Sequence, residues 1–297
     1  MSHWTFDNIP DQSGRTAVVT GSNTGIGFET ARMLALKGAQ VVLACRSADK
    51  GQAAVGRILA EAPSAQVSFL ALDLADLERV AAFAQAFSER HERLDLLILN
   101  AGVMVPPASK TAQGFELQFG VNHLGHFALT GALLERVEAS SGRVVVVSST
   151  AAQFGKMRFE DLHFEQRYQA WPAYGQSKLA NQLFVRELQK RLKSKGSSVL
   201  VTAAHPGWTA TDLQRTSGLA TFLNPVFAMK PPQGALPTLR AATDPAAGPG
   251  DYFGPDGMMQ MRGHPVKVPM VKDAENSEHA ARLWQLSEEL TGVRYGL

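Results

Sequence analysis

The sequence predicts an α/β fold in which helices cover both faces of a doubly wound parallel sheet. Short runs rich in β-branched residues or leucine alternate with stretches of helical periodicity, and the first run is followed by a glycine-rich turn. Right-handed crossovers between parallel strands place helices on both faces. The predicted strands are residues 15–20, 39–45, 65–72, 94–100, 142–148 and 197–204. The predicted helices are residues 28–37, 50–61, 77–89, 115–137 and 173–193.

Glycine and polar residues follow each predicted strand at the point where it ends. In chain order these positions are Gly21 to Gly27, Cys45-Arg46, Asp73-Leu74, Asn100 to Gly102, Ser148-Ser149 and His205 to Gly207. Doubly wound sheets bind their ligands at the carboxyl ends of the strands, near the point where strand order reverses. A random scatter of such residues would not follow six strand ends in order, so we expect a ligand site at this edge.

The whole-chain composition indicates one globular domain over residues 1–297. Apolar residues make up 45% and charged residues 19%, and the net charge of +2 gives no reason to expect nucleic acid or an anionic membrane as a partner. The single Cys45 excludes an internal disulfide and a multi-cysteine metal site, which is typical of a reducing compartment. The N-terminal residues lack a signal-peptide pattern and the longest apolar runs are too short to span a bilayer. We therefore expect a cytoplasmic protein.

The run TGSNTGIG, residues 20–27, is predicted to cradle a phosphate group. It follows a strand and opens a helix, where glycine permits positive φ and the unpaired N–H groups of the helix start attract an anion. The GxxxGxG spacing differs from the commoner GxGxxG, and the strand-turn-helix context gives the motif its weight. The expected cofactor-binding residues here are Gly21, Ser22, Asn23, Thr24, Gly25, Ile26 and Gly27.

The end of the second strand favours NADP over NAD. An NAD-specific protein usually places a carboxylate there for the adenosine ribose, whereas this chain has Cys45 followed by Arg46. Arg46 could contact a 2′-phosphate, with help from Ser22 and Lys50, through charge-assisted hydrogen bonds. The alternative is a solvated surface arginine.

The third and fourth strand ends supply further candidate cofactor contacts. Asp73, followed by Leu74, could bind the adenine amino group, although an aspartate here could equally cap the next helix. Asn100, Ala101 and Gly102 offer small residues where the backbone passes close to a cofactor ribose, with an ordinary strand-ending turn as the alternative.

Tyr174 and Lys178 lie four residues apart in WPAYGQSKLANQLF, which places a phenol and an ammonium on one helix face. This spacing arises easily by chance, and a half-buried aromatic beside a solvated lysine is the simplest alternative. The surrounding motifs decide between the two interpretations.

Taken together, these motifs resemble the short-chain dehydrogenase/reductase superfamily. TGSNTGIG, LNAG, VNHLGHF, VVVVSS, YGQSK and HPGWTATDL occur in the order of that family between about residues 15 and 269. The segments ACRSADKG, YGQSKLANQLF and YFGPDG are most similar to the retinol dehydrogenase-like and WW-domain oxidoreductase-like branch, with protochlorophyllide reductases more distant. The resemblance implies a single-domain Rossmann-type fold.

The resemblance assigns catalytic roles to four residues. Tyr174 is the expected general acid and base, and Lys178 is expected to hold the nicotinamide ribose and, with the cofactor's charge, to lower the pKa of the phenol. Ser149 is expected to orient the substrate oxygen; the family pattern and strand alternation favour it over Ser148. Asn122 is expected to bend its helix and to hold a water on a proton path to Lys178; an asparagine with only local backbone bonds is the alternative.

Further positions follow the family segment that contacts the nicotinamide carboxamide and the pyrophosphate. They are Pro206, Gly207, Thr209 and Thr211, although the family usually has an aliphatic residue at the position of Thr209. His123, His126 and His205 have no accompanying metal-binding pattern, so we expect packing or surface histidines.

Two apolar segments are expected to form the substrate pocket. Residues 150–172 are an insertion before Tyr174 that contains Phe154, Met157, Phe159, Tyr168 and Trp171. Residues 208–230 occupy the position of the family's substrate loop and contain Leu213, Leu219, Phe222, Leu223, Phe227 and Met229. Residues 231–297 complete the domain. Such walls predict a bulky, largely apolar substrate, although each side chain could equally cover the core.

The resulting functional hypothesis is an NADP(H)-dependent oxidoreductase that moves hydride between nicotinamide and a secondary alcohol or carbonyl carbon, with NAD(H) as the less favoured cofactor. Retinol dehydrogenases commonly carry an N-terminal membrane-anchoring helix that this sequence does not show, which argues against a retinoid. Reduction of an activated C=C bond and a non-catalytic NADP-binding regulator are the alternatives; the complete set of Asn122, Ser149, Tyr174 and Lys178 favours an enzyme. Homo-oligomerisation stays open.

Overall fold

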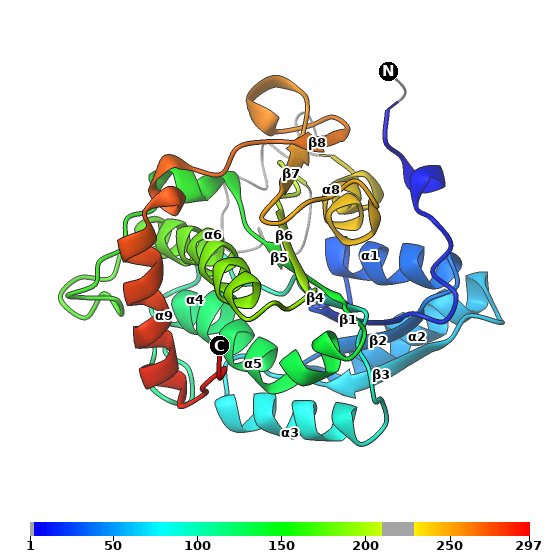
Figure 1. Ribbon diagram of the computed structural model, residues 1–297, viewed down its shortest axis with the longest axis horizontal. Coiled ribbons are helices and arrows are strands. Elements are labelled where there is room, and N and C mark those ends of the chain that lie inside the picture. The colour runs from blue at the N-terminus through cyan, green and yellow to red at the C-terminus, as the bar shows by residue number, and fades with distance from the viewer. Residues whose placement is uncertain (1–2, 210–228) are drawn as a thin grey trace.

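A single eight-stranded sheet forms the centre of the molecule (Figure 1). The computed structural model describes residues 3–209 and 229–297. The strand order is β3-β2-β1-β4-β5-β6-β7-β8; each pair up to β6·β7 is parallel, and β8 runs antiparallel to β7. The strands are β1 (Thr16–Thr20), β2 (Gln40–Cys45), β3 (Val67–Ala71), β4 (Leu96–Leu99), β5 (Arg143–Val147), β6 (Leu200–Ala204), β7 (Tyr252–Pro255) and β8 (Pro265–Lys267).

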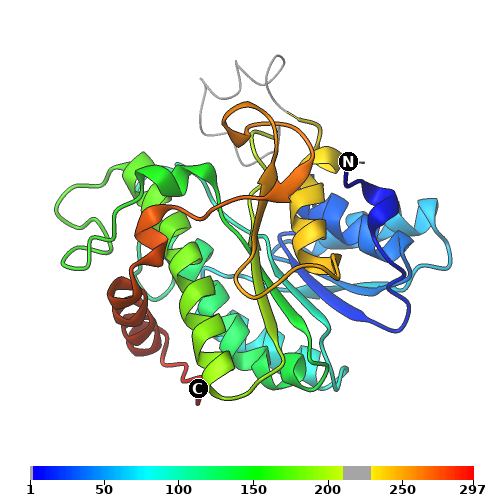
Figure 2. The same cartoon turned by 45° about the horizontal axis from the view of Figure 1, so that its top comes forward.

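Helices cover both faces of this sheet, as predicted. Successive strand residues point to opposite faces, so Val18 and Leu97 join one core cluster while Val19 and Ile98 join the other. The helices α6 and α8 lie on opposite sides of the strand layer (Figure 2). One face is covered by α1 (Gly25–Leu36), α2 (Ala48–Glu61) and α8 (Pro231–Thr243); the other is covered by α3 (Leu77–Ser88), α5 (Gly125–Glu138) and α6 (Ala170–Ser194).

The C-terminal helix α9 (Ser277–Thr291) packs on the outer side of α6 (Figure 1). Its Trp284 stacks on Phe184 of α6, and Tyr295 beyond it packs on the same indole ring. The insertion before Tyr174 reaches this helix through the ring contact of Phe159 with His279. Within residues 3–209 and 229–297, no helix has the length and apolarity needed to cross a bilayer.

All six predicted strands are present, and two short strands were not predicted. β7 and β8 contain Gly254, Pro255 and Pro265. Glycine and proline are unusual inside strands, so neither segment has the sequence pattern that predicts one. β3 differs from the expected buried strand because it lies at the sheet edge, where only one neighbour covers it, and its residues are half-buried or exposed.

The predicted helix 115–137 is interrupted near its start. A short α4 (Leu117–Phe119) passes into a π-helical turn over Gly120–Leu124 before α5 begins at Gly125. At Gly125 a Cβ would lie 2.5 Å from the carbonyl oxygen of Leu74, so this helix approaches the end of β3 more closely than any side chain allows. The extra residue of the π-turn displaces Asn122 from a regular helical position.

Candidate active site

A cleft of about 1150 Å³ opens at the carboxyl ends of the central strands, where strand order reverses between β1 and β4. Residues from the loops after β1, β4, β5 and β6 and from the start of α6 line it, as expected for a doubly wound sheet. Among the predicted site residues, the lining includes Gly21, Asn23, Thr24, Gly25, Ile26, Gly27, Asn100, Ala101, Gly102, Ser149, Tyr174, Lys178, Pro206, Gly207 and Thr209.

The glycine-rich turn fits a dinucleotide phosphate. Gly21 has a φ of 66°, and a Cβ there would lie 2.8 Å from the Cα of Ala101. At Gly27 a Cβ would lie 2.4 Å from both the Asn100 Nδ2 atom and the Gly21 carbonyl oxygen. Only glycine therefore lets β1, the turn and the start of α1 pack this closely, and the N-terminus of α1 opens onto the cleft.

Ser22 does not reach this lining. Its side chain is fully buried, and its hydroxyl has no hydrogen-bond partner among the described residues. The suggested assistance of Ser22 at a 2′-phosphate therefore has no geometric support.

The candidates at the ends of β2 and β3 lie beyond the main cleft. Arg46 is exposed and makes no ion pair in the described part of the chain, and Lys50 is exposed on α2. Asp73 accepts a hydrogen bond from the Ala75 amide at 3.0 Å, while the cap of α3 is Asp76. The capping alternative for Asp73 is therefore wrong. Leu74 is buried in the core.

Tyr174 and Lys178 are both buried on the first turns of α6, with the Lys178 Nζ atom 5.8 Å from the centre of the phenol ring. Nζ donates a hydrogen bond to the carbonyl oxygen of Val147 at 3.1 Å, which ties α6 to the end of β5. Burial lowers the pKa of Lys178 to about 8. The alternative of a solvated lysine is excluded.

Burial raises the pKa of Tyr174 to about 12, and a hydrogen bond with the Ser149 side chain offsets part of this rise. This rise is the effect of the protein alone, because burial disfavours the charged phenolate. The lowering expected from Lys178 together with the cofactor's charge concerns the cofactor-bound enzyme and stays a prediction. The protein itself thus keeps the phenol protonated at neutral pH.

The two serines after β5 have different partners. Ser148 donates to the carbonyl oxygen of Lys178 at 2.8 Å and accepts from Gln182 at 3.3 Å. Ser149 instead faces Tyr174 and accepts from the Ala151 amide at 3.2 Å. Ser148 therefore supports α6, whereas Ser149 lies where it can contact a substrate beside the Tyr174 phenol.

Asn122 binds across the structure and not within its own helix. Its Oδ1 accepts from the Val103 amide at 2.8 Å, and its Nδ2 donates to the Val103 carbonyl oxygen at 3.0 Å and to Ser177 Oγ at 2.9 Å. The alternative of purely local backbone bonds is therefore wrong. The π-turn is the local irregularity that the sequence predicted for this position.

The segment after β6 contributes part of the lining. Gly207 has a φ of 62°, and a Cβ there would lie 2.5 Å from the Met261 carbonyl oxygen. Thr209 donates from its hydroxyl to the Pro206 carbonyl oxygen at 2.8 Å. Thr211 and most of the predicted substrate loop, including Leu213, Leu219, Phe222, Leu223 and Phe227, lie outside the described residues, whereas Met229 is buried.

Sequence reasoning missed a clamp that joins two walls of the cleft. Gln118 accepts from the Val105 amide at 2.8 Å and donates to the carbonyl oxygen of Ala170 at 2.9 Å and to the Tyr168 hydroxyl at 3.2 Å. The Tyr168 hydroxyl in turn donates to the Pro106 carbonyl oxygen at 2.9 Å. The loop after β4 is thereby tied to the insertion before Tyr174. No motif in the sequence marks this glutamine.

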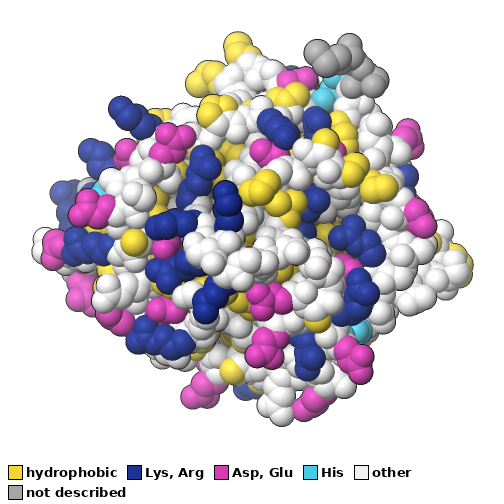
Figure 3. All heavy atoms as spheres, in the orientation of Figure 1, with side chains coloured by type: hydrophobic (Ala, Val, Ile, Leu, Met, Phe, Trp, Pro, Cys, Tyr) yellow, Lys and Arg dark blue, Asp and Glu magenta, His cyan; other side chains and the backbone are white. Residues whose placement is uncertain are grey.

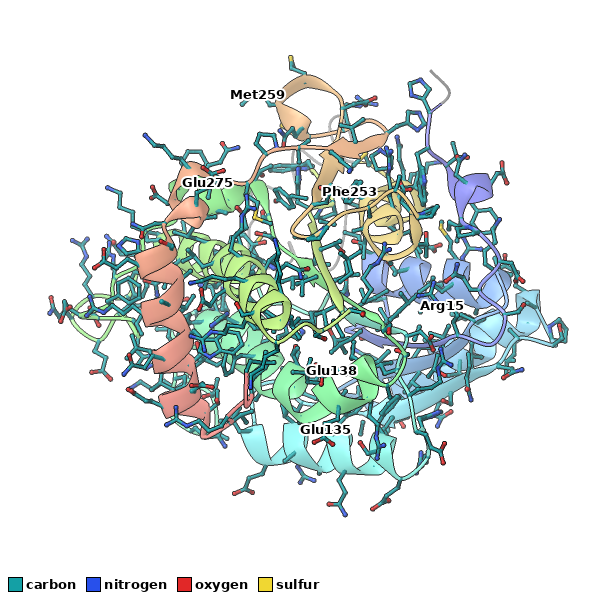
Figure 4. The ribbon with its side chains drawn as sticks, in the orientation of Figure 1. Arg15, Glu135, Glu138, Phe253, Met259 and Glu275 are labelled. Carbon is teal, nitrogen blue, oxygen red and sulfur yellow. The ribbon has the colours of Figure 1, made fainter. Side chains whose placement is uncertain are left out.

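The loop between β7 and β8 forms another unpredicted wall. Met259, Gln260 and Met261 line the cleft, and Met259 points outward at the edge of the molecule (Figure 4). Met259 and Gln260 have φ values of 54° and 55°, and Gln260 Oε1 lies 2.9 Å from His205 Nε2. His205 is therefore a packing residue, as predicted, and its contact with Gln260 also supports this wall of the cleft.

The fold and the cleft define a dinucleotide-binding α/β protein. A family model described as short chain dehydrogenase matches residues 15–220. The chain is 44% identical over 288 residues to retinol dehydrogenase 12 of Mus musculus, covering 95% of this chain and 88% of that protein. It is 43% identical over 293 residues to retinol dehydrogenase 13 of Homo sapiens, covering 94% and 85%. The chain therefore belongs to the short-chain dehydrogenase/reductase family and acts on CH–OH groups with NAD(P)(H).

Solved structures support the same assignment. An uncharacterised protein from Mycobacterium paratuberculosis has a TM-score of 0.83 and 42% identity, with 100% of both chains covered. An active-site complex of Pseudomonas aeruginosa RhlG with NADP has a TM-score of 0.66 and 26% identity, covering 84% of this chain and 96% of that chain. The similarity to retinol dehydrogenases 12 and 13 confirms the retinol dehydrogenase-like branch that the motifs indicated.

Proposed function

We propose that the protein is an NADP(H)-dependent dehydrogenase/reductase for a bulky, largely apolar alcohol or carbonyl compound. The proposal rests on the positions of Ser149 and Tyr174. Their side chains face one another at the apolar end of the cleft, and the phosphate cradle forms its other end. The bound nicotinamide supplies or accepts the hydride. The dinucleotide would be held by residues that line the cleft, namely Gly21, Asn23 to Gly27, Asn100 to Gly102, Lys178, Pro206 and Gly207.

The roles of the protein groups follow from their surroundings. In reduction, the Tyr174 phenol, kept protonated by its raised pKa, donates its proton to the substrate oxygen and becomes a phenolate. In oxidation, the phenolate form of Tyr174 removes the proton of the substrate hydroxyl. Ser149 orients that oxygen by a hydrogen bond. Lys178 is hydrogen-bonded to the Val147 carbonyl oxygen, and the Asn122 side chain is hydrogen-bonded to the backbone of Val103. These bonds hold the protein groups on both sides of the reacting substrate atoms in fixed positions.

The substrate class is inferred from the cleft walls. Phe154, Trp171 and Met259 line the cleft and are 82%, 53% and 77% exposed, which places large apolar side chains at its rim. Apolar side chains are visible at the top of the molecule, near the loop between β7 and β8 (Figure 3). Trp171 also lies edge-on to Tyr174, with ring centres 6.4 Å apart. Such walls favour an apolar substrate over a sugar or an acid.

The preference for NADP(H) rests on Arg46. Its exposed guanidinium, without an ion-pair partner in the described part of the chain, is available for a 2′-phosphate at the end of β2, where a carboxylate would serve NAD. The single cysteine supports a reducing compartment such as the cytoplasm, which fractionation of the expressed protein would test.

Turnover assays with purified protein test the proposal directly. NADPH consumption is measured with ketones and aldehydes of graded size, and NADP⁺ reduction with the matching alcohols; retinal and retinol are included because of the names of the relatives. We expect turnover of bulky apolar members and none with Tyr174→Phe, which should still bind NADPH. Tyr174→Phe activity equal to wild type, or turnover confined to small polar compounds, would refute the proposal. Product mass identifies any reduction of a C=C bond.

A further inference from the structure

A buried hydrogen-bond chain connects the end of β1 to the helix that carries Asn122, and His126 is its central member. His126 lies on the first turn of α5 and is 2% exposed. Its Nε2 atom is 2.9 Å from Thr20 Oγ1, and its Nδ1 atom is 3.1 Å from the backbone carbonyl oxygen of Asn122. Neither the metal hypothesis nor simple packing accounts for two such contacts.

Counting hydrogens at Thr20 determines which ring nitrogen carries the proton. The Thr20 hydroxyl oxygen accepts from the backbone amides of Asn100 and Ala101, each at 2.9 Å. A hydroxyl has two acceptor lone pairs and one hydrogen, so these amides occupy both lone pairs. A hydrogen on His126 Nε2 would direct a third donor at the same oxygen. His126 Nε2 must therefore accept the Thr20 hydrogen, for which the alternative acceptor, the Ile98 carbonyl oxygen, is farther away at 3.4 Å.

With Nε2 as the acceptor, the neutral ring carries its hydrogen on Nδ1 and donates it to the Asn122 carbonyl oxygen. From Asn122 the chain continues through the side-chain amide to Ser177 Oγ at 2.9 Å, and Ser177 donates to the Tyr174 carbonyl oxygen at 2.8 Å. Each side-chain donor in this path has a partner. A fully satisfied buried network of this kind holds its members in one arrangement.

The surroundings of His126 keep the ring neutral. Burial lowers the pKa of His126 to about 3, and the nearby charge of Lys178 acts in the same direction, while the bond to Asn122 opposes it. A second ring proton would also face the Thr20 hydrogen across 2.9 Å. Burial and the hydrogen bond with Thr20 therefore both favour the neutral ring.

We propose that His126, as the neutral Nδ1–H tautomer, is a positioning residue that couples the cofactor cradle at Thr20, Asn100 and Ala101 to Asn122 and the catalytic helix α6. It touches neither substrate nor cofactor; it orients the Thr20 hydroxyl and holds the backbone of the π-turn. The expected effect on turnover rests on the proposed function, whereas the tautomer follows from the protein alone.

Nitrogen NMR of the full chain labelled with ¹⁵N-histidine tests the tautomer without any assay, and His126→Asn assigns the signals. We expect a pyrrole-like shift on Nδ1 and a pyridine-like shift on Nε2 from pH 7 down to about 5, where an ordinary histidine is already protonated. A hydrogen on Nε2, or a doubly protonated ring in this range, would overturn the inference.

Variants test the coupling. Thr20→Val removes three hydrogen bonds and His126→Phe removes two. Each variant should weaken NADPH binding and lower kcat by at least about tenfold, the factor that a single buried hydrogen bond contributes, with a smaller change in substrate KM. Thr20→Ser, which keeps the hydroxyl, should restore what Thr20→Val loses.

The matched control is His123→Asn. His123 is buried one turn earlier, and its Nε2 lies 2.9 Å from Ser287 Oγ of α9, away from the cleft. This variant should lower Tm and leave NADPH affinity and kcat near wild type. If Thr20→Val and His126→Phe lower only Tm, as the control does, the positioning role is wrong. A wild-type protein that binds no NADPH refutes the proposed function, while the nitrogen shifts still decide the tautomer.

Discussion

The hydroxyl of Ser148 donates a hydrogen bond to the backbone carbonyl oxygen of Lys178 at 2.8 Å. The first serine after β5 therefore braces α6, and the second, Ser149, is left facing Tyr174. Strand alternation explains why adjacent serines of one motif have such different surroundings. It also separates a structural from a chemical role in two neighbouring residues.

Replacing each serine with alanine should separate these roles. Ser149→Ala should lower kcat by about 10²-fold, the usual cost of one hydrogen-bond donor at a reacting oxygen, with little change in Tm. Ser148→Ala should lower the free energy of unfolding by about 1–3 kcal/mol, because it removes the two buried hydrogen bonds that Ser148 makes with the Lys178 carbonyl oxygen and the Gln182 side-chain amide. Steady-state kinetics and thermal unfolding measure the two effects. The reverse pattern would exchange the two assignments.

The two reaction directions should depend on pH with opposite sign. Burial raises the pKa of Tyr174 to about 12, so the phenol is protonated and ready to donate for carbonyl reduction over the neutral range. Alcohol oxidation needs the phenolate, whose fraction grows with pH. Plots of log kcat should therefore rise with pH for oxidation, and fall for reduction above about pH 8 as Lys178 loses its proton. An oxidation rate that declines from pH 7 to 9 in a stable enzyme would contradict this.

Lys178→Met should abolish turnover and stabilise the fold. Burial lowers the pKa of Lys178 from 10.5 to about 8, so below pH 8 the folded protein carries a buried ammonium that the variant lacks. Between pH 8 and 10.5 the unfolded chain binds more protons than the folded one, and wild-type stability rises with pH there. The stability advantage of Lys178→Met should thus be constant below pH 8 and shrink above it. Urea unfolding across pH measures it; a less stable variant at pH 7 would show that the ammonium is well compensated.

Arg46→Ala should weaken NADPH but not NADH. A lost charge-assisted hydrogen bond to a 2′-phosphate costs about 1.5–3 kcal/mol, which corresponds to roughly 10–100-fold in Kd. NADH lacks that phosphate, so its Kd should stay unchanged. Arg79→Ala, which removes another exposed arginine, on α3, is the control for net charge. Equal losses of affinity for NADPH and NADH would show that Arg46 is a solvated surface arginine that does not contact the 2′-phosphate.

Breaking the clamp at Gln118 should loosen the substrate end of the cleft. Gln118→Leu removes the acceptor for Val105, whose φ of 51° is unfavourable for a β-branched residue and costs about 1–2 kcal/mol. We expect a lower Tm and a raised KM for bulky substrates, with NADPH affinity unchanged. Tyr168→Phe loses only the hydroxyl contacts with Gln118 and Pro106, so its effect should be smaller. A larger effect on NADPH than on substrate would place the clamp at the cofactor end instead.

The sequence predicted the parts of the site that depend on local order along the chain. Strand-helix alternation predicted the strands β1 to β6, and the strand ends located the cradle, Asn100 to Gly102 and the Ser148-Ser149 pair. The four-residue spacing placed Tyr174 and Lys178 on one helix face, as α6 shows. These features need only the periodicity of helices and strands and the steric freedom of glycine.

Other features depend on contacts between residues far apart in the chain, and only the tertiary structure decided them. Burial raises the pKa of the Tyr174 phenol in the protein alone, and the close approach of α5 to Leu74 accompanies the π-turn around Asn122.

Contacts between residues 13 to 106 positions apart likewise determine the β7–β8 wall, the Gln118 clamp and the position of the hydrogen on His126 Nδ1. The Tyr174–Lys178 spacing could be read from the sequence, but the desolvation around that pair could not, because burial is a property of the packed fold and not of any segment within it.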